Sequence, residues 1–189
     1  MKKYELTAEF IEQWGKKLFR IKALISFGSV EAGELGGYVE KEDNLAQDGN
    51  AWVYGNARVH GNAEVYGNAE VCDDARVYGD AWVHGNAWVY GNARVYGNAE
   101  VCGNADYLLI GRIGSRFSFT TFFKNKDKGI TVSCGCFLGT IAEFRAKVTD
   151  THGNNKHAKM YNLAADMAEL QILGEEHFDK LNTNKSEPF

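Results

Sequence analysis

Small and aliphatic side chains recur every six residues through the middle of the chain, from Gly49 to Leu108. Each hexad has an alanine and, two residues later, a valine or its substitute, so these two share one face of a short strand. A Gly-Asn pair or an aspartate variant of it opens each hexad, and these residues tolerate the positive φ of a sharp corner. The ten uninterrupted hexads read GNAWVY, GNARVH, GNAEVY, GNAEVC, DDARVY, GDAWVH, GNAWVY, GNARVY, GNAEVC and GNADYL.

Three hexads predict a closed triangular coil with alanine and valine inside, and coils must stack because one coil cannot bury its own apolar face. The recurrence of a small and an aliphatic residue every six positions resembles the left-handed parallel β-helix of hexapeptide-repeat proteins. The left hand is implied by that resemblance and not by the spacing. We predict a mainly β fold, in which residues 49–108 form this solenoid, residues 1–48 an N-terminal cap with a first degenerate coil, and residues 109–189 a small α+β domain.

The first 48 residues predict elements that close one end of the solenoid. The pattern indicates a weak helix over Ala8–Trp14 that stops at Gly15, followed by a strand near Leu18–Leu24. Such a cap is needed because an exposed strand edge invites further pairing. Val39 and Leu45 lie at multiples of six before Ala51, which predicts an early, degenerate coil.

The last 81 residues change pattern. Alternating apolar residues predict strands at Ser118–Asn125 and Ile130–Phe137, joined by a turn. Thr140 is followed three residues later by a glutamate, which is a capping box, and Gly153 would end the helix that follows. A second helix is expected over Asn155–Leu173. The large apolar residues at helical spacing within it are Met160, Leu163, Met167 and Leu170.

Composition narrows the class of protein. The net charge is −4, so we expect no non-specific nucleic-acid binding. The first ten residues lack the apolar core of a signal peptide, and we expect no membrane span. The four cysteines do not form the pattern of a secreted disulfide framework. Together these features predict a protein of the cytoplasm.

Residues eighteen apart should stack at roughly 4.8 Å, so the outward positions form ladders. One predicted ladder contains Arg58, Arg76 and Arg94 and is flanked by His60, Tyr78 and Tyr96. A second face carries Trp52, Glu70, Trp88 and Asp106 beside Tyr54, Cys72, Tyr90 and Leu108. The third face carries Glu64, Trp82 and Glu100 beside Tyr66, His84 and Cys102.

Stacked guanidinium groups repel one another by about 1 kcal/mol per neighbouring pair in water, so something should offset the arginine ladder. The ladder can meet a Glu/Trp face of a neighbouring subunit in a homo-oligomer, and the resemblance to left-handed β-helix proteins favours a trimer. Alternatively, it binds an anionic ligand such as a nucleotide, with arginine on phosphate and tyrosine on the base. Plain solvent exposure is the third interpretation.

Two further clusters can carry chemistry. In the segment Gly111–Arg116, glycines let backbone amides approach a phosphate that Arg112, Ser115 and Arg116 would bind, although a simple connector explains the same residues. The second cluster comprises Cys134, Cys136, His152 and His157. It can be read as a zinc site, as buried thiols or as a redox site, and we expect no metal and no cofactor.

Catalysis is the less favoured interpretation. Many hexapeptide-repeat proteins are acyltransferases that use acetyl-CoA, and those place a catalytic histidine near a loop that interrupts the coils. No loop interrupts the ten hexads, and His60 and His84 occupy variable outward positions. No Ser/His/Asp set or carboxylate pair is evident either.

Motifs outside the repeat resemble proteins of phages and prophages of low-GC Gram-positive hosts. The resemblance implies a phage context. Together with the arginine ladder, the Gly111–Arg116 segment and the lack of an evident catalytic set, it predicts a non-catalytic counter-defence protein that sequesters an anionic, nucleotide-type signal in the host cytoplasm. Alternatives are an inhibitor that binds a host defence protein through exposed tryptophans (Trp52, Trp82 and Trp88) and a CoA-dependent acyltransferase. The motifs that carry the resemblance lie at residues 2–6, 18–24, 33–40, 113–116, 134–137 and 151–153.

Overall fold

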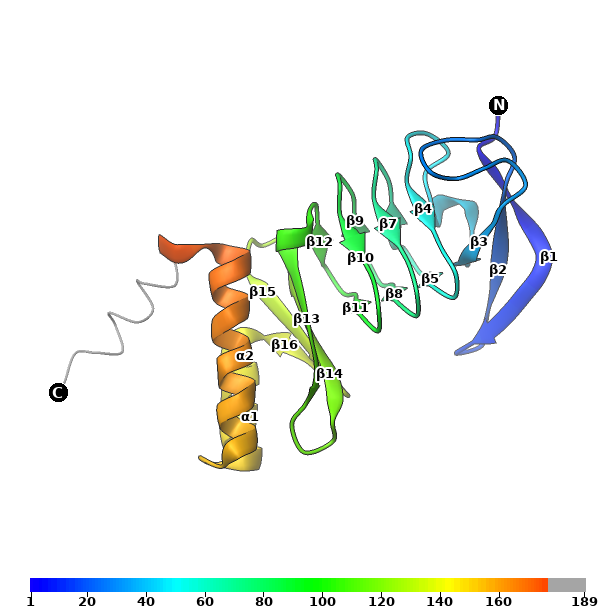
Figure 1. Ribbon diagram of the computed structural model, residues 1–189. Helices are drawn as coiled ribbons and strands as arrows, with labels where there is room; N and C mark the ends of the chain where they lie inside the picture. Colours follow the sequence, from blue (N-terminus) through cyan, green and yellow to red (C-terminus); the bar gives the residue numbers. More distant parts are fainter. Residues whose placement is uncertain (177–189) are drawn as a thin grey trace. The chain divides into compact units, whose positions relative to one another are not determined.

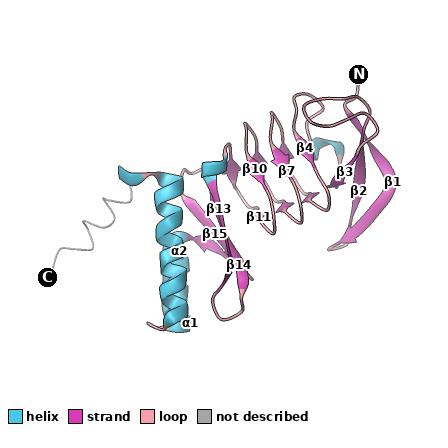
Figure 2. Ribbon diagram, in the orientation of Figure 1, coloured by secondary structure: helices cyan, strands magenta, loops and turns pink. Residues whose placement is uncertain are grey.

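The computed structural model describes residues 1–176, which divide into two compact units, one of residues 1–104 and one that begins at Ala105. The first unit is a parallel β-solenoid preceded by an antiparallel hairpin, and the second is a four-stranded antiparallel sheet with two helices (Figures 1 and 2). The predicted fold class is therefore confirmed. Within the described residues, no helix combines the length and the apolar composition needed to cross a membrane.

Each hexad of the solenoid contributes one two-residue strand made of the variable residue and the valine. Strands eighteen residues apart pair in parallel, so that Arg58 lies beside Arg76 and Arg76 beside Arg94. The strands are β4 (Trp52–Val53), β5 (Arg58–Val59), β6 (Glu64–Val65), β7 (Glu70–Val71), β8 (Arg76–Val77), β9 (Trp82–Val83), β10 (Trp88–Val89), β11 (Arg94–Val95) and β12 (Glu100–Val101).

The interior of the solenoid is built from the repeated alanines and valines. Every one of these side chains from Ala51 to Val101 is at most 1% exposed. At the corners, glycines adopt φ values such as +58° at Gly55 and +75° at Gly79, and Asp73 adopts +60° where the repeat lacks glycine. The corner asparagines also stack, because the Asn50 side-chain amide donates to Asn68 at 3.1 Å.

The N-terminal cap is a hairpin of β1 (Tyr4–Gln13) and β2 (Lys16–Ala23). The predicted helix over Ala8–Trp14 is wrong: this segment pairs with β2, and Trp14 and Gly15 form the turn with φ of 50° and 75°. Cross-strand pairing along the hairpin stabilises this segment as a strand, although the local spacing of its apolar residues is helical.

The hairpin joins the solenoid through β3 (Leu35–Val39), which pairs antiparallel with β2 and parallel with β5. An early degenerate coil is present, but its phase differs from the prediction. Val39 aligns with Val59 and Leu45 with Val65, a spacing of twenty residues, so both occupy valine positions and not alanine positions. A short 3-10 helix, η1 (Glu42–Asn44), lies between them.

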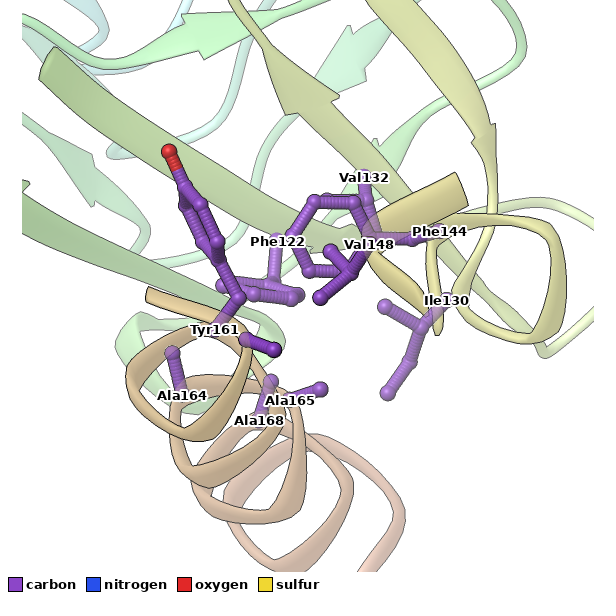
Figure 3. Packing of buried hydrophobic residues seen from close by; sticks show 10 residues of the cluster. Phe122, Ile130, Val132, Phe144, Val148, Tyr161, Ala164, Ala165 and Ala168 are labelled. Atoms are coloured by element: carbon purple, nitrogen blue, oxygen red, sulfur yellow. The ribbon is translucent and has the colours of Figure 1, made fainter. Parts of the chain in front are cut away.

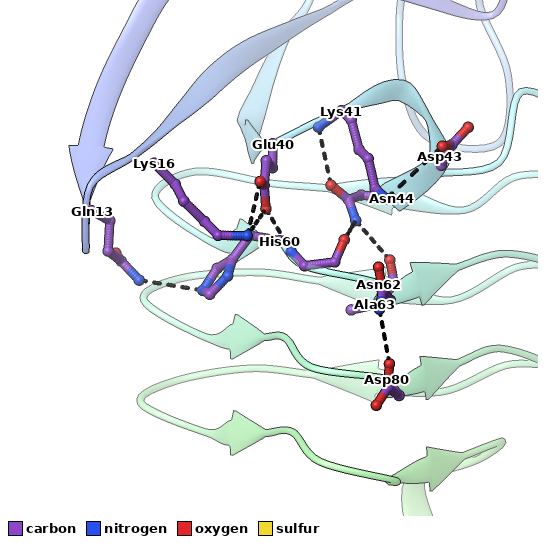
Figure 4. Close-up of polar contacts among 11 residues, drawn as sticks. Gln13, Lys16, Glu40, Lys41, Asp43, Asn44, His60, Asn62, Ala63 and Asp80 are labelled. Atoms are coloured by element: carbon purple, nitrogen blue, oxygen red, sulfur yellow. Dashed lines mark hydrogen bonds and ion pairs between the residues drawn. The ribbon is translucent and has the colours of Figure 1, made fainter.

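Polar side chains fasten this first coil to the next (Figure 4). The Asn44 amide group donates to the backbone oxygens of Gly61 at 3.1 Å and Ala63 at 2.8 Å. Glu40 accepts from the Gly61 amide at 2.7 Å and pairs with Lys16 at 2.9 Å. These contacts satisfy backbone groups at the point where the regular repeat has not yet begun.

The tenth hexad leaves the solenoid. Its residues form the 3-10 helix η2 (Asn104–Asp106) and the start of β13 (Tyr107–Ile113), so Asp106 and Leu108 do not extend the Trp/Glu face as predicted. The second unit continues with β14 (Ser118–Lys124), β15 (Ile130–Cys134), β16 (Phe137–Thr140), α1 (Ile141–His152) and α2 (Lys156–Leu173).

Both helices of the second unit are confirmed, including the capping box of Thr140 and Glu143 and the end of α1 at Gly153. The large apolar residues of α2, however, do not face the core. Its small residues, Ala164, Ala165 and Ala168, pack under the sheet with Phe122 and Phe144 (Figure 3). Close packing of the helix on the sheet selects alanine, which leaves the larger side chains of α2 outside.

Candidate functional site

The arginine ladder forms as predicted on the sheet that contains β5, β8 and β11. The rings that flank it also stack: His60 lies 5.0 Å from Tyr78, and Tyr78 lies 4.5 Å from Tyr96, with interplanar angles of 7° and 9°. Burial, with help from Arg58 and Arg94, lowers the pKa of Arg76. Burial, followed by the neighbouring Tyr96, raises the pKa of Tyr78 to about 12.

The β1–β2 hairpin occupies one end of this ladder. Gln13 accepts a hydrogen bond from Arg58 at 2.6 Å, and the ring of Trp14 lies 5.5 Å from His60 and 5.6 Å from Tyr78. His60 is only 6% exposed, and burial lowers its pKa. Arg58 and His60 therefore serve the attachment of the cap, while Arg76 and Arg94 lie further along the ladder.

The other two outward faces also stack in the predicted register, but Trp52 differs from its prediction. Trp52 is fully buried between Tyr4 and Phe27, with ring centroids 6.0 and 5.4 Å away. It cannot belong to an exposed tryptophan patch, whereas Trp82 and Trp88 are 37% and 50% exposed. The packing of a cap segment on the first coil is a long-range contact that the hexad pattern does not encode.

A cavity of about 360 Å³ lies within the second unit. It is bounded by the β13–β14 turn, the β15–β16 turn, one face of α1 and Tyr161 of α2. Ser115 and Arg116 come from the first turn, and Lys147 and His152 come from α1. The complete lining is Ser115, Arg116, Ser118, Cys134, Gly135, Cys136, Phe137, Phe144, Lys147, Val148, Thr151, His152 and Tyr161.

The segment Gly111–Arg116 lies within the second unit and is therefore not a connector between the two units. Its first residues end β13, and Gly114 to Phe117 form a hairpin turn. Gly114 has a φ of +74°, and a β-carbon there would collide with the hydroxyl of Tyr161. The glycine is needed for this close approach, which brings Arg116 to the cavity and leaves Arg112 outside its lining.

Tyr161 and Cys134 form the inner wall of the cavity. Burial raises the pKa of Tyr161 to about 12, Cys134 adds to this, and the charge of Arg116 acts against it. The ring of Tyr161 stacks on His152 at 5.8 Å, and the Thr120 hydroxyl contacts the Cys134 sulfur at 3.2 Å. The tyrosine is thus a neutral hydrogen-bonding group at neutral pH.

The cysteine and histidine cluster is only partly assembled. Cys134 ends β15 while Cys136 lies exposed in the following turn, so the two thiols do not share a strand face. His152 and His157 approach with ring centroids 5.7 Å apart. Residues 1–176 contain no group of three or more histidine, cysteine and acidic side chains placed to hold a metal ion.

Lys147, Phe137, Phe144 and Tyr161 are lining residues that the sequence analysis did not select. A signal for Lys147 existed: it lies three residues after Phe144 and four before Thr151 on α1, so these side chains share a helix face. The aromatic residues carried no such signal, because they come from separate elements that meet only in the folded unit.

The fold defines a β-solenoid repeat protein, and the comparisons with known proteins agree with that class. A family model described as a YdcK β-solenoid repeat matches residues 69–85 and 87–103. The Uncharacterized acetyltransferase YdcK of Escherichia coli (strain K12) is 40% identical over 62 residues, which are 29% of this chain and 19% of that protein. The chain thus matches about a fifth of the length of this relative, and a phage origin stays a prediction.

Proposed function

We propose that this protein is a non-catalytic binding protein whose second unit holds a small anionic ligand of nucleotide type. The observation that carries the proposal is the lining of the cavity: two cations, Arg116 and Lys147, stand beside aromatic rings, and the lining includes no carboxylate. Arginine pairs with phosphate oxygens in a forked geometry, and aromatic rings stack on a base. A volume of about 360 Å³ suits one mononucleotide better than a larger ligand.

The test is calorimetric titration with mononucleotides, their cyclic forms and inorganic phosphate. We expect binding of a nucleotide to weaken by roughly tenfold or more in both Arg116→Ala and Lys147→Ala, because each removes a charge-assisted hydrogen bond. Lys128→Ala is the matched control, since this exposed lysine of the β14–β15 turn does not line the cavity. Equal affinities in all variants, or no binding by the wild type, would contradict the proposal.

The biological use that we propose is removal of a nucleotide signal from a bacterial host during phage infection. It is supported by the resemblance of the cap and tail motifs to phage proteins, and inhibition of a host defence protein is the alternative. Native mass spectrometry of protein purified gently from host cells distinguishes them. A bound mass of several hundred daltons favours sequestration, whereas co-purification of a host protein favours inhibition.

An acyltransferase is the second candidate, favoured by the name of the similar Escherichia coli protein. The described solenoid argues against it, since its hexads contain no inserted loop and His60 is enclosed by Trp14 and Tyr78. Release of CoA from acetyl-CoA, assayed with a broad panel of amines and alcohols, would establish the enzyme. A complete lack of turnover would leave the binding function as the better account.

A further inference from the structure

The outer face of α2 carries a row of large apolar side chains that the rest of the described residues leave exposed. Met160, Leu163, Met167 and Leu170 are 39%, 63%, 56% and 46% exposed. Four such residues in a continuous row along one helix are unlike the isolated exposed hydrophobic residues found on any protein surface. We call this row the α2 stripe.

The spacing of the α2 stripe is three, four and three residues, which is the a/d spacing of a coiled-coil seam. The row is also symmetric about Ala165, because Met160 and Leu170 lie five residues to either side and Leu163 and Met167 lie two. In an antiparallel pair of identical helices, Met160 therefore faces Leu170 of the other copy, and Leu163 faces Met167. The α2 stripe of one copy is therefore complementary to the α2 stripe of a second copy.

The charges at the two ends of α2 favour the same arrangement. Lys156 and Lys159 are exposed near the first turn, and Glu175 and Glu176 are exposed just beyond the last. Antiparallel pairing brings the lysines of one copy toward the glutamates of the other at both ends, whereas parallel pairing brings like charges together. Antiparallel helices also place opposite ends of their macrodipoles side by side.

We propose that the α2 stripe is a two-fold symmetric docking surface for the α2 helix of a second copy of this chain. A closed two-fold contact of this kind uses the same patch on both partners. A lipid surface fits less well, because an interfacial helix needs basic residues along its polar face, whereas the exposed lysines of α2, Lys156 and Lys159, lie only near its first turn. This contact is independent of the ligand cavity and of the arginine ladder.

Sedimentation equilibrium of the full chain tests the docking surface. The wild type should have a mass that is an even multiple of 21.0 kDa, and Leu163→Glu should halve it, because a charge at the centre of the seam opposes association. Leu138→Glu, a substitution at a 44% exposed leucine on β16, is the matched control and should leave the mass unchanged. Circular dichroism checks that both variants stay folded, as expected for exposed positions. Equal masses for the wild type and Leu163→Glu would overturn the proposal.

Charge reversal tests the orientation of the helices. Replacing Lys156 and Lys159 with glutamate should weaken association, and adding Glu175→Lys and Glu176→Lys to that variant should restore it. Restoration is expected only when the lysines of one copy lie beside the glutamates of the other. Association that stays weak in the fourfold variant would overturn the antiparallel arrangement.

Discussion

The side chain of Lys3 makes several of the polar contacts between the cap and the first coil. It is 2% exposed, and its ammonium group donates to the backbone oxygens of Asp48 at 3.1 Å and Ala51 at 3.0 Å. The ring of Phe27 lies 4.9 Å from the same nitrogen. Burial lowers the pKa of Lys3 from 10.5 to about 8, although Asp48 acts in the opposite direction.

This lysine gives the stability of the protein a defined pH dependence. Between about pH 8 and pH 10.5 the unfolded chain binds more protons at Lys3 than the folded chain does. Its contribution to the free energy of unfolding therefore rises with pH through this window and is least favourable below pH 8. Melting temperatures measured from pH 7.5 to 9.5 should show the rise, and Lys3→Met should flatten it. An unchanged slope in that variant would contradict the assignment.

Single residues also mark the limit of what the sequence predicts. The hexad pattern correctly predicted the partners of Arg76 and Tyr78, because stacking in a repeat is set by the spacing alone. It failed for Trp52, which occupies an outward position and yet is buried by Tyr4 and Phe27. That burial depends on where a non-repetitive segment folds back, and no local pattern specifies it.

At the scale of elements, the corner glycines divide into crowded and open positions. Gly85 has a φ of +63°, and a β-carbon there would collide with the backbone oxygen of Cys102. Gly97 has a φ of +70° but no atom within 4 Å of the same point. The two corners thus share a backbone conformation and differ in the space around it.

Alanine substitution separates these two effects. Gly97→Ala should cost about 1–2 kcal/mol, the strain of a left-handed conformation alone. Gly85→Ala should cost more, because the coils must also move apart at that corner. Urea unfolding of the two variants measures the difference in the free energy of unfolding. Equal losses of unfolding free energy in the two variants would show that neighbouring coils move apart at their corners with little cost.

The elements of the second unit show why its cavity could be predicted only in part. Ser115, Arg116 and the Cys134/His152 pair were selected from the sequence as two separate clusters, and the structure brings them to one cavity. Their meeting depends on the hairpin turn at Gly114 and on the packing of α2 against the sheet. The α2 stripe was read as helical spacing, correctly, but spacing cannot tell which face meets the sheet when alanines suit it better.

At the scale of the whole molecule, the arginine ladder places three like charges in one column. Arg58 donates a hydrogen bond to Gln13, whose side chain is neutral. Burial and both neighbouring arginines lower the pKa of Arg76. We propose that a Glu/Trp face of a neighbouring subunit supplies the negative charge in a homotrimer. The triangular cross-section of the solenoid, with three distinct faces, suits contacts around a threefold axis.

Joint replacement of Arg58, Arg76 and Arg94 by alanine separates assembly from ligand binding. We expect the mass of the assembly, measured by light scattering, to fall to one third of the wild-type value. A nucleotide should still bind with unchanged affinity in the second unit. Loss of binding with intact assembly would instead move the anion site to the ladder. No change in either property would show that the ladder is a solvated surface.

The eighteen-residue register has a consequence for how such a chain can change over generations. Near-identical tandem codons gain or lose copies when the DNA strands slip during replication. A gain of three hexads adds one complete coil and leaves each ladder in line, as Arg58, Arg76 and Arg94 now are. A gain of one hexad turns every later side chain by a third of a circle, so that arginines continue a column of tryptophan and glutamate. Viable length variants should therefore differ by whole coils.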